Sequence, residues 1–544
     1  MATLRYASLL HLIGICAAGG FNSRLFRPLS FLKRRFSSLH REHKSDLRAS
    51  SPAGIQWTTT ERAFNGCSWR IIVARLVVVS NRVAIPNTDV SDRAGGLAIA
   101  IRPVLKQHPG IWFGWSGKVA AKSDVTVRTI ERGHQSYVLT DLAQEDYQEY
   151  YNGFANRVLW PIFHYRLDIA EFSRRDLTGY MRVNEHFAAD LHKILLPDDN
   201  IWVHDYHLLP LAKTLRDLGR RNKIGFFHHI PFPPPEILTA LPNHEHLIPA
   251  MCHYDLIGFQ TDRDAMNFAH YLRDECGMPS RDPYTFQAAD RTVRIGVFPV
   301  GVETAELNRL ARRAVHSRFV RDVVESLAGR DMIIGVDRLD YTKGIVLRLE
   351  AFDRFLSAHP DWRAKVTYLQ ITPKSRSEIR EYADMERQID ETAGRVNGTY
   401  GEASWTPIRY VNRSHSRSVL AGLYRSARAA LVTPLRDGMN LVAKEYVACQ
   451  DPENPGVLIL SRFAGAAVEC ATALLVNPYD PESVGTAIRQ ALSMSVEERR
   501  SRNDALFQVL MANDVKSWGN RFLMALTRPL KPPNWPRQID LSQI

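Results

Sequence analysis

The sequence predicts an α/β fold with two parallel sheets, and three observations support this prediction. Short apolar runs typical of strands alternate with helical patterns from about residue 76 onward. A second series of such runs begins after a helical, basic stretch at 305–330. With 544 residues, the chain is too long for one ordinary core, so two or three domains are expected. Two sheets in one chain imply two domains and a cleft.

The expected strands are short and are bounded by polar or turn-forming residues. Those of the first sheet lie at 76–80, 201–204, 224–227, 256–259 and 295–299. Those of the second sheet lie at 332–336, 366–371, 408–411, 429–432, 457–460 and 474–476. Because helical patterns separate consecutive strands, the strands should pair in parallel through helical crossovers.

The charge distribution argues against a nucleic-acid-binding protein. The formal net charge is +12, but residues 1–73 hold 11 Lys/Arg and 3 Asp/Glu, which leaves 59 basic against 55 acidic residues in the rest of the chain. The body shows no zinc-finger spacing and no basic helix with heptads, so no nucleic-acid partner is expected. Phosphorylated small substrates need only a few local cations.

Cysteine usage and hydropathy predict a cytoplasmic protein with no membrane association. The six cysteines form no Cys-x-x-Cys pair and are too sparse for a disulfide framework, so free thiols in a reducing compartment are expected. No apolar stretch reaches the roughly 18 to 20 residues of a membrane span.

The segment 1–73 is expected to be disordered, and its origin is left open. It is rich in Arg and Ser and poor in acids, which is typical of a transit peptide, while 6–18 would suit a weak signal-peptide core. Alternatively it is an extension that results from misreading a start codon at position 73. The fold pattern begins abruptly at Arg75.

The stretch 429–445 predicts a nucleotide-sugar site. An apolar run at 429–432 predicts a buried strand, and 441–448 favours helix. Asp437 should therefore lie at the carboxyl end of a strand, where ligands bind in open α/β sheets and where the next helix N-terminus attracts phosphate. Gly438 lets the backbone approach a ligand, Asp437 can accept sugar hydroxyls, and Glu445 can reach a ribose diol.

The segment Arg436-Asp-Gly-Met-Asn-Leu-Val-Ala-Lys-Glu445 resembles the donor-binding segment of the trehalose-6-phosphate synthase family, retaining glycosyltransferases of the GT-B architecture. Matches continue from Arg75 to about Thr527. The resemblance implies two Rossmann-like domains, at 74–308 for the acceptor and 309–513 for the nucleotide sugar, and a helix at 514–530 that crosses back. It implies donor binding by Asp437, Gly438, Met439, Asn440, Leu441, Val442, Ala443, Lys444 and Glu445.

The resemblance implies a phosphate clamp for the acceptor. Arg82, which follows the first strand, and Arg376, which follows a strand of the second sheet, match the phosphate-binding arginines of the family. Tyr151 matches a hydroxyl that bonds the same phosphate. A guanidinium fork fits phosphate oxygens better than an ammonium does, and a clamp built from both domains would favour closure of the cleft.

The acceptor sugar ring is expected to lie against Trp160 and Asp205. An indole can lie on a sugar face, and Asp205 matches the carboxylate that holds acceptor hydroxyls. For the neighbouring Phe154, Phe163 and Tyr165, core packing is expected instead.

The diphosphate of the donor is expected to meet Arg338 and Lys343. Two fixed cations would stabilise the negative charge on the departing nucleotide, and they can replace a metal ion. Gly95 and Gly96 are expected to contact the donor through the main chain. At His415 the chain departs from bacterial relatives, which often carry Phe near the nucleobase, so the nucleobase preference is left open.

No metal site is expected. Asp262-Arg-Asp264 has the Asp-x-Asp pattern of metal-dependent glycosyltransferases, but Thr261 before an apolar-periodic segment favours a helix N-cap. His204 and His207 stand near Asp205 at a strand end, without a fixed third ligand.

A second strand end carries His229, which matches the histidine expected near the hydroxymethyl group of the transferred glucose. Ile230 and Trp160 match positions linked with the choice of acceptor anomer. His228 is expected to pack or to face solvent.

The resemblance implies transfer of glucose from UDP-glucose to the C1 hydroxyl of glucose 6-phosphate with retention, which gives α,α-trehalose 6-phosphate and UDP in trehalose biosynthesis. UDP-glucose is a substrate, and no cofactor is expected. Two alternatives stay open, a sister transferase such as glucosylglycerol-phosphate synthase and a non-catalytic sugar-phosphate sensor. The chain lacks the aspartate-rich segment of a fused phosphatase, so a separate trehalose-phosphate phosphatase is the expected partner. Whether the protein is a homo-oligomer is left open.

Overall fold

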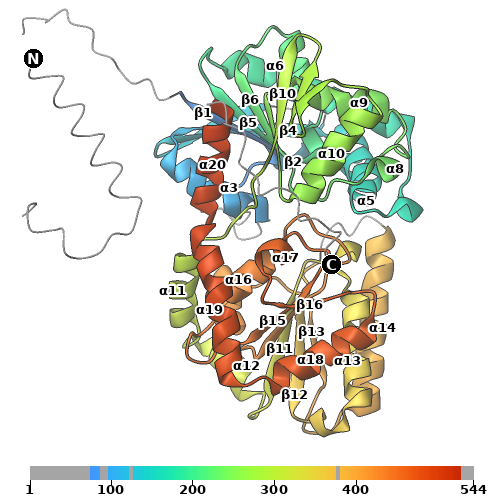
Figure 1. The fold of residues 1–544 in the computed structure, drawn as a ribbon, viewed down its shortest axis with the longest axis vertical. Coiled ribbons are helices and arrows are strands. Elements are labelled where there is room, and N and C mark those ends of the chain that lie inside the picture. The colour runs from blue at the N-terminus through green and yellow to red at the C-terminus, as the bar shows by residue number, and fades with distance from the viewer. Residues whose placement is uncertain (1–73, 86–95, 122–125, 375–379, 528–544) are drawn as a thin grey trace, which may run out of the picture. The chain divides into compact units, whose positions relative to one another are not determined.

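The computed structural model of the protein describes residues 74–85, 96–121, 126–374 and 380–527, with the side chain of Arg380 left out. The segment 1–73 and the predicted site residues Gly95 and Arg376 lie outside the described residues. The described chain forms two sheets with helices packed on them, which confirms the predicted α/β architecture (Figure 1).

The first sheet has ten strands in the order β3-β4-β2-β1-β5-β6-β7-β10-β9-β8. The pairs β3–β4, β9–β10 and β8–β9 are antiparallel, and the other neighbours are parallel. The strands are β1 (Leu76–Arg82), β2 (Gly110–Ala120), β3 (Val127–Arg132), β4 (Gln135–Ala143), β5 (Asn200–His204), β6 (Lys223–Phe227), β7 (Leu256–Phe259), β8 (Ser280–Asp282), β9 (Thr285–Ala288) and β10 (Arg291–Val297).

Five of these strands, β2, β3, β4, β8 and β9, were missing from the prediction. Strands β3 and β8 are short, polar and mostly exposed at the sheet edges, so they carry no apolar pattern. In β2, glycines interrupt the pattern because neighbouring backbones come close. A Cβ on Gly110 would lie 1.9 Å from the carbonyl oxygen of Leu76. The pairing with β1 on one side and with β4 on the other makes this stretch a strand.

The second sheet has six parallel strands in the order β13-β12-β11-β14-β15-β16, and all six were predicted. The strands are β11 (Asp331–Val336), β12 (Val366–Ile371), β13 (Ile408–Val411), β14 (Ala429–Val432), β15 (Val457–Ser461) and β16 (Leu474–Val476). The chain order reverses between β11 and β14, as it does between β1 and β5 in the first sheet. Such reversals are where open parallel sheets bind ligands.

Helices connect the strands of both sheets. With the first sheet go α3 (Gly96–Gln107), α4 (Gln144–Asp146), η2 (Tyr147–Leu159), α5 (Trp160–Phe163), η3 (Leu167–Ile169), α6 (Arg174–Ile194), η4 (Tyr206–Leu208), α7 (Leu211–Asp217), α8 (Pro235–Leu238), α9 (His244–Ala250), η5 (Met251–His253) and α10 (Asp262–Asp274). Then follow α11 (Thr304–Ala314), α12 (Arg318–Glu325), η6 (Tyr341–Lys343), α13 (Ile345–Ala358), η7 (Pro360–Trp362), α14 (Arg380–Tyr400), α15 (Arg417–Ser426), α16 (Leu441–Cys449), α17 (Ala466–Glu469), α18 (Pro481–Ser493), α19 (Val496–Ala512) and α20 (Val515–Thr527).

The last described helix, α20, follows the second sheet in sequence but packs on the first, beside α3 (Figure 1). Its Phe522 ring stacks on Trp202 of β5 at 4.7 Å between centroids. The sheet makes room for this ring through a glycine, because a Cβ on Gly225 would lie 2.8 Å from Phe522. This helix is the predicted crossover, and it carries buried apolar side chains of the C-terminal part into the first-sheet core.

Candidate active site

A cavity of about 810 Å³ lies between the carboxyl ends of the two sheets. We call its two sides the first-sheet wall and the second-sheet wall. The first-sheet wall comes from the ends of β1, β5 and β6, from η2 and α5, and from α3. The second-sheet wall comes from the loop after β11, the loop after β14 and the start of α16. The two points at which the strand order reverses, which we call switch points, therefore open on one cavity.

Most residues predicted for the site line this cavity. They are Arg82, Gly96, Tyr151, Trp160, Asp205, His229, Ile230, Arg338, Lys343, Asp437, Met439, Asn440, Leu441, Val442 and Glu445. Four other predicted residues do not line it, namely His415, Gly438, Ala443 and Lys444. Their placement is described below, and the individual roles of all these residues remain predictions.

The loop after β11 presents two cations that are each paired with a carboxylate. Arg338 Nη2 donates to Asp340 at 3.1 Å, and Asp340 is fully buried while Arg338 is about two-fifths exposed. Lys343 Nζ forms an ion pair with Asp437 across the two loops. The Asp340 carboxylate also accepts the backbone N–H and the hydroxyl of Thr342, so it fixes the turn that carries Lys343.

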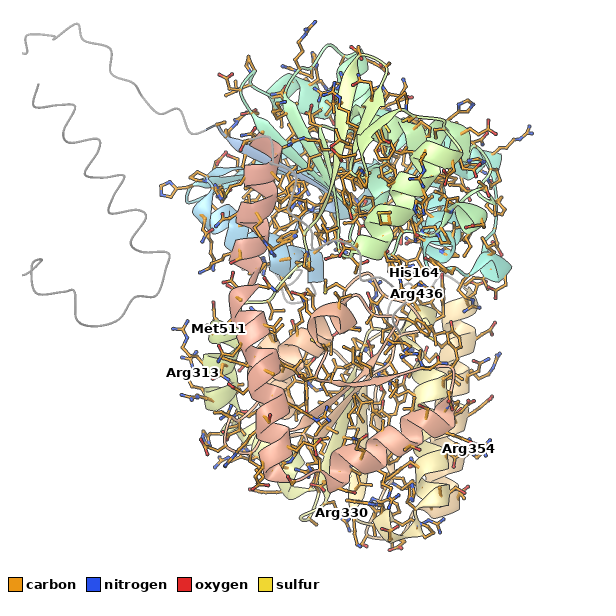
Figure 2. All side chains as sticks on the ribbon, viewed as in Figure 1. His164, Arg313, Arg330, Arg354, Arg436 and Met511 are labelled. Carbon is orange, nitrogen blue, oxygen red and sulfur yellow. The ribbon has the colours of Figure 1, made fainter. Side chains whose placement is uncertain are left out.

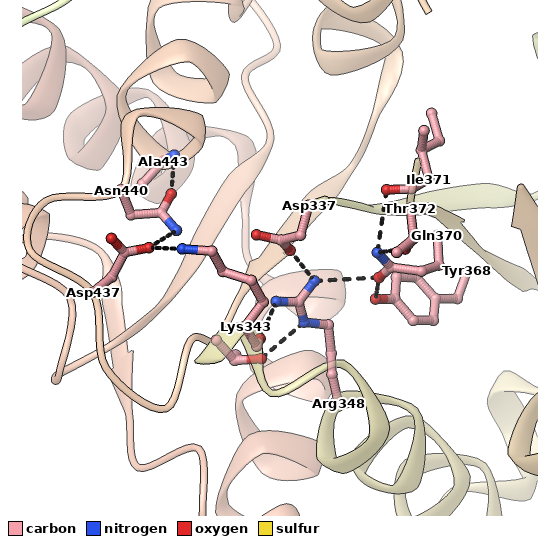
Figure 3. Close-up of polar contacts among 11 residues, drawn as sticks. Asp337, Lys343, Arg348, Tyr368, Gln370, Ile371, Thr372, Asp437, Asn440 and Ala443 are labelled. Atoms are coloured by element: carbon pink, nitrogen blue, oxygen red, sulfur yellow. Dashed lines mark hydrogen bonds and ion pairs between the residues drawn. The ribbon is translucent and has the colours of Figure 1, made fainter. Parts of the chain in front are cut away.

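A buried arginine under this loop ties it to the sheet (Figure 3). Arg348 on α13 is fully buried and donates to Asp337 at 2.6 Å and to the Lys343 carbonyl at 3.0 Å. It also donates to Thr433 Oγ1 at 2.9 Å, at the end of β14, and to Gln370 Oε1 at 3.2 Å. One guanidinium thereby holds the ends of β11, β12 and β14, because its fixed fork matches several acceptors at once.

Asn440 organises the start of α16 as the helix cap. It has a φ of 77°, a left-handed value that asparagine tolerates better than most residues. Its Oδ1 accepts the N–H of Ala443, and its Nδ2 donates to Asp437 Oδ2 at 3.1 Å. The helix predicted from 441 is thus confirmed, and the Ala443 N–H is used inside the chain.

Gly438 and Lys444 serve contacts within the protein. A Cβ on Gly438 would lie 2.1 Å from the His229 carbonyl oxygen, so this glycine lets the two walls approach each other. The Lys444 ammonium is fully buried, pairs with Glu469 and donates to the Val300 carbonyl at 2.7 Å. Val300 lies where the chain leaves the first sheet, so Lys444 joins α16 to that connection.

The first-sheet wall is aromatic because a wide helix brings several rings together. Helix η2 has π-type geometry over 13 residues, which is rare beyond single turns and is frequent at functional sites. Tyr151 lies on it and stacks on His207 at 6.0 Å with an interplanar angle of 10°. Trp160 follows η2, and the Arg338 guanidinium lies over its ring at 5.0 Å. Arg338, which is predicted to bind the donor substrate, thus contacts Trp160, which is predicted to bind the acceptor substrate.

Asp205 and His229 are linked through the backbone at adjacent strand ends. Asp205 has a φ of 75°, a strained value for a residue other than glycine, and its Oδ1 accepts the His229 N–H at 3.1 Å. The His229 ring Nε2 lies 3.0 Å from Nδ1 of the buried His204. Burial lowers the pKa of His229 to about 3, so its ring is neutral at pH 7.

The packing predictions for the neighbouring rings hold for His228, Phe154 and Phe163, which are buried, and are wrong for Tyr165. Tyr165 is partly exposed, and the Arg436 guanidinium carbon lies 3.7 Å from its ring centroid. Figure 2 shows Arg436 near His164, the neighbour of Tyr165. His164 and Tyr165 follow α5, whereas Arg436 lies in the loop after β14. The tyrosine therefore forms a cation–π contact between these two segments, outside the cavity lining.

The side chain of His415 packs on a neighbouring helix. Its ring packs on Phe319 of α12 at 5.3 Å, and it is absent from the cavity lining. A main-chain contact with a nucleobase remains a prediction.

The Asp-x-Asp pattern is a helix start, as predicted. Thr261 Oγ1 accepts the N–H of Asp264 at the start of α10. The Asp264 carboxylate is buried and accepts the N–H of Phe232 and the hydroxyl of Thr261. In the part of the chain that is described, no three His, Cys, Asp or Glu side chains cluster as metal ligands. Among the same residues, no helix is long and apolar enough to cross a membrane.

Several residues of the cavity were missed by the site prediction. Asn81, His204, His207 and Asp337 all line it. His204 ends β5 and Asp337 directly follows β11, so the strand-end rule that placed Asp437 would have found both. Asn81 lies within β1, and His207 lies in η4, three residues after the end of β5.

Comparison with known proteins places the chain in a defined family. The model of a family described as glycosyltransferase family 20 matches residues 65–528. A trehalose-6-phosphate synthase of Sinorhizobium fredii is 52% identical over 457 residues, which cover 84% of this chain and 98% of the relative. One from an Enterobacter species is 45% identical over 456 residues, 84% of this chain and 96% of the relative.

Solved structures agree in sequence and in fold. An α,α-trehalose-phosphate synthase (UDP-forming) from Burkholderia xenovorans, in complex with glucose-6-phosphate, is 45% identical with a TM-score of 0.82, over 84% of this chain and 100% of the other. The Escherichia coli protein bound with UDP-2-fluoro glucose is 44% identical with a TM-score of 0.80, over the same shares.

Proposed function

The chain belongs to glycosyltransferase family 20, and on that premise we propose that it transfers glucose from UDP-glucose to glucose 6-phosphate. The products are α,α-trehalose 6-phosphate and UDP, with retention at the transferred carbon. Relatives with 44–45% identity are described in complex with glucose-6-phosphate and with UDP-2-fluoro glucose. The reaction needs no cofactor, since UDP-glucose is a substrate.

The pair of cations on the second-sheet wall is the observation that carries the proposal. Arg338 and Lys343 project from one short loop at the switch point between β11 and β14. Breaking a sugar–phosphate bond leaves negative charge on the nucleotide, and fixed cations placed there stabilise the transition state. Because Arg348 and Asp340 already hold the loop, little reorganisation would be needed when the charge develops.

Retention is proposed to proceed on the front side of the sugar. A double displacement would need a free carboxylate as nucleophile. The Asp437 carboxylate is engaged by Lys343 and by Asn440, which suits it to orient the donor sugar. The leaving phosphate oxygen would then take the proton of the acceptor hydroxyl, with Arg338 and Lys343 holding that phosphate.

The first-sheet wall is proposed to hold the acceptor. Arg82 and Tyr151 would bind its phosphate, and Trp160 and Asp205 would bind its ring; all four line the cavity. His229 would contact the hydroxymethyl group of the transferred glucose, and Ile230 would influence the choice of anomer. Arg376, outside the described residues, would complete the phosphate clamp from the second domain.

Product analysis with different acceptors tests the proposal. The purified protein is incubated with UDP-glucose and either glucose 6-phosphate or glycerol 3-phosphate, UDP release is followed, and the product is identified by NMR. Fast transfer to glucose 6-phosphate is expected, because glycerol 3-phosphate would leave the ring-binding groups unpaired. Faster transfer to glycerol 3-phosphate would assign a sister activity. No transfer to either would favour a sugar-phosphate sensor.

Three further proposals concern the context of the reaction. The product retains its phosphate, so a separate phosphatase would be needed to release free trehalose. The substrates are cytoplasmic metabolites, which places the reaction in the cytoplasm. The domain limits 74–308, 309–513 and 514–530 are proposed as the units that close around the substrates.

A further inference from the structure

His204 is a buried titratable residue that the proposed mechanism does not use. It ends β5, has no exposed surface, and packs against the rings of Trp202 at 4.6 Å, Phe227 at 6.4 Å and Trp518 at 6.3 Å. Trp518 belongs to α20, so the crossover helix closes this cluster. Within the described chain, the ring makes one hydrogen bond, which joins its Nδ1 to His229 Nε2 at 3.0 Å.

Both imidazoles of this pair are neutral. Burial lowers the pKa of His204 well below its usual range, and the neighbouring His229 lowers it further. Burial also lowers the pKa of His229 to about 3. A neutral imidazole carries one N–H and one lone pair, so one ring donates in this hydrogen bond and the other accepts.

The second nitrogen of His204 decides which ring donates. Its Nε2 is buried and has no hydrogen-bond partner among the described residues. If His229 donated, the His204 proton would sit on this nitrogen as a buried N–H without an acceptor. Orphaned buried N–H groups are rarer than under-satisfied acceptors. The lower-energy arrangement puts the proton on His204 Nδ1, which then donates to His229 Nε2.

The tautomer of His229 follows from this arrangement. With its Nε2 accepting, the proton of the neutral ring must sit on Nδ1. His229 lines the cavity, and no hydrogen bond within the described chain uses its Nδ1. We propose that His204 is a positioning residue that fixes the tautomer of His229, which thereby offers an Nδ1–H donor to a hydroxyl oxygen of the transferred sugar. The sugar as ligand rests on the proposed function.

The tautomer can be measured without any substrate. Long-range ¹H–¹⁵N correlation spectra of protein labelled only at histidine distinguish protonated from unprotonated ring nitrogens, and a His229→Gln spectrum assigns the signals. We expect a protonated Nδ1 and an unprotonated Nε2 for His229. The reverse pattern would overturn the proposal, whichever substrates the protein accepts.

Two variants of nearly equal size separate positioning from packing. Asn in His204→Asn keeps an N–H donor near the place of Nδ1, whereas Leu in His204→Leu has none. Relative to His204→Asn, His204→Leu should lower kcat/KM for UDP-glucose roughly tenfold to hundredfold, the usual effect of losing a hydrogen bond in a built site. Thermal unfolding of both variants is the control for folding.

The donor UDP-xylose sharpens this test, because its sugar lacks the hydroxymethyl group proposed to meet His229. With UDP-xylose the two variants should turn over at equal rates. An equal loss with both donors would show a purely structural role and overturn the proposal. Absence of transfer from UDP-glucose by the wild-type protein would instead contradict the proposed function. The NMR result would still decide the tautomer of His229.

Discussion

The two walls of the cavity are built by different physical means. The second-sheet wall is charged, and buried ion pairs hold it, with Arg348 and Asp337 almost wholly excluded from solvent. The first-sheet wall also carries Arg82 and Asp205, but its centre consists of neutral rings, in which Tyr151 stacks on His207 and His204 bonds His229. Fixed charges suit a diphosphate, whereas neutral donors, acceptors and ring faces suit a sugar.

The two walls should therefore respond to different perturbations, the loss of an ion-pair partner for one and low pH for the other. A buried guanidinium fails when its partner is lost, because the remaining charge has no solvent to stabilise it. Neutral buried imidazoles reduce the stability of the folded protein at low pH, because burial disfavours their charged form.

Replacing Arg348 by methionine should destabilise the protein by about 3 to 5 kcal/mol, because Asp337 would remain buried without its partner. Chemical denaturation measures the loss. The double variant Arg348→Met/Asp337→Leu should recover most of the stability but little of the turnover, because the loop that carries Lys343 loses its anchor. Full activity in the double variant would contradict the anchoring role.

Lys343→Ala should lower kcat by a factor of hundreds while the fold stays intact. Losing one electrostatic donor to a developing charge typically costs about 3 to 4 kcal/mol. Steady-state kinetics with circular dichroism measures both properties, and Lys213→Ala, an exposed lysine paired with Asp217, is the matched control. A variant that kept more than about a tenth of the wild-type rate would rule out the leaving-group role.

Acid should weaken the aromatic packing of the first-sheet side of the protein, where His164 and His228 are buried outside the cavity lining. Burial lowers the pKa of His164 to about 4 and that of His228 to about 3, from 6.5. Below pH 6.5 these two imidazoles become protonated in the unfolded chain but stay neutral in the folded protein. The free energy of unfolding therefore falls as the pH falls towards 4. Each should cost about 2 kcal/mol by pH 5. Denaturation at pH 7 and pH 5 measures the sum.

A single substitution isolates one contribution to this pH dependence. His228→Phe should flatten the fall in stability, since the ring lies among Phe163, Phe232 and Phe259 and would carry no titrating group. Asp264 acts in the opposite direction, because burial raises its pKa to about 6 and the folded state therefore gains a proton first. An unchanged pH dependence in His228→Phe would contradict the assignment.

Chelation of divalent ions should leave turnover unchanged, which is the smallest effect of the series. If the diphosphate is neutralised by Arg338 and Lys343, the second-sheet wall needs no metal ion. Initial rates with and without EDTA test this expectation. If EDTA lowered the rate and magnesium or manganese restored it, Arg338 and Lys343 would not be sufficient to neutralise the diphosphate.

Local sequence pattern was sufficient to predict the second sheet. Four of its six strands, β11, β12, β14 and β15, are almost wholly buried apolar runs, and such runs keep their signal without tertiary context. The strand-end rule then placed Asp437, because parallel strands present their carboxyl ends to the same edge. Asp205 and Arg338 were assigned to the site by the resemblance of their motifs to those of the family.

Only the tertiary structure decided the edge strands, the ring contacts and the partners of buried charges. Strand β3 is a strand because it pairs with β4. Tyr165 is partly exposed and contacts the Arg436 guanidinium, which comes from the loop after β14. Lys444 lies within the donor-binding motif, yet its ammonium meets Val300 and Glu469, which are distant in sequence. Hydrogen bonds and ion pairs of this kind form between segments whose proximity no local pattern encodes, so their partners appear only once the chain has folded.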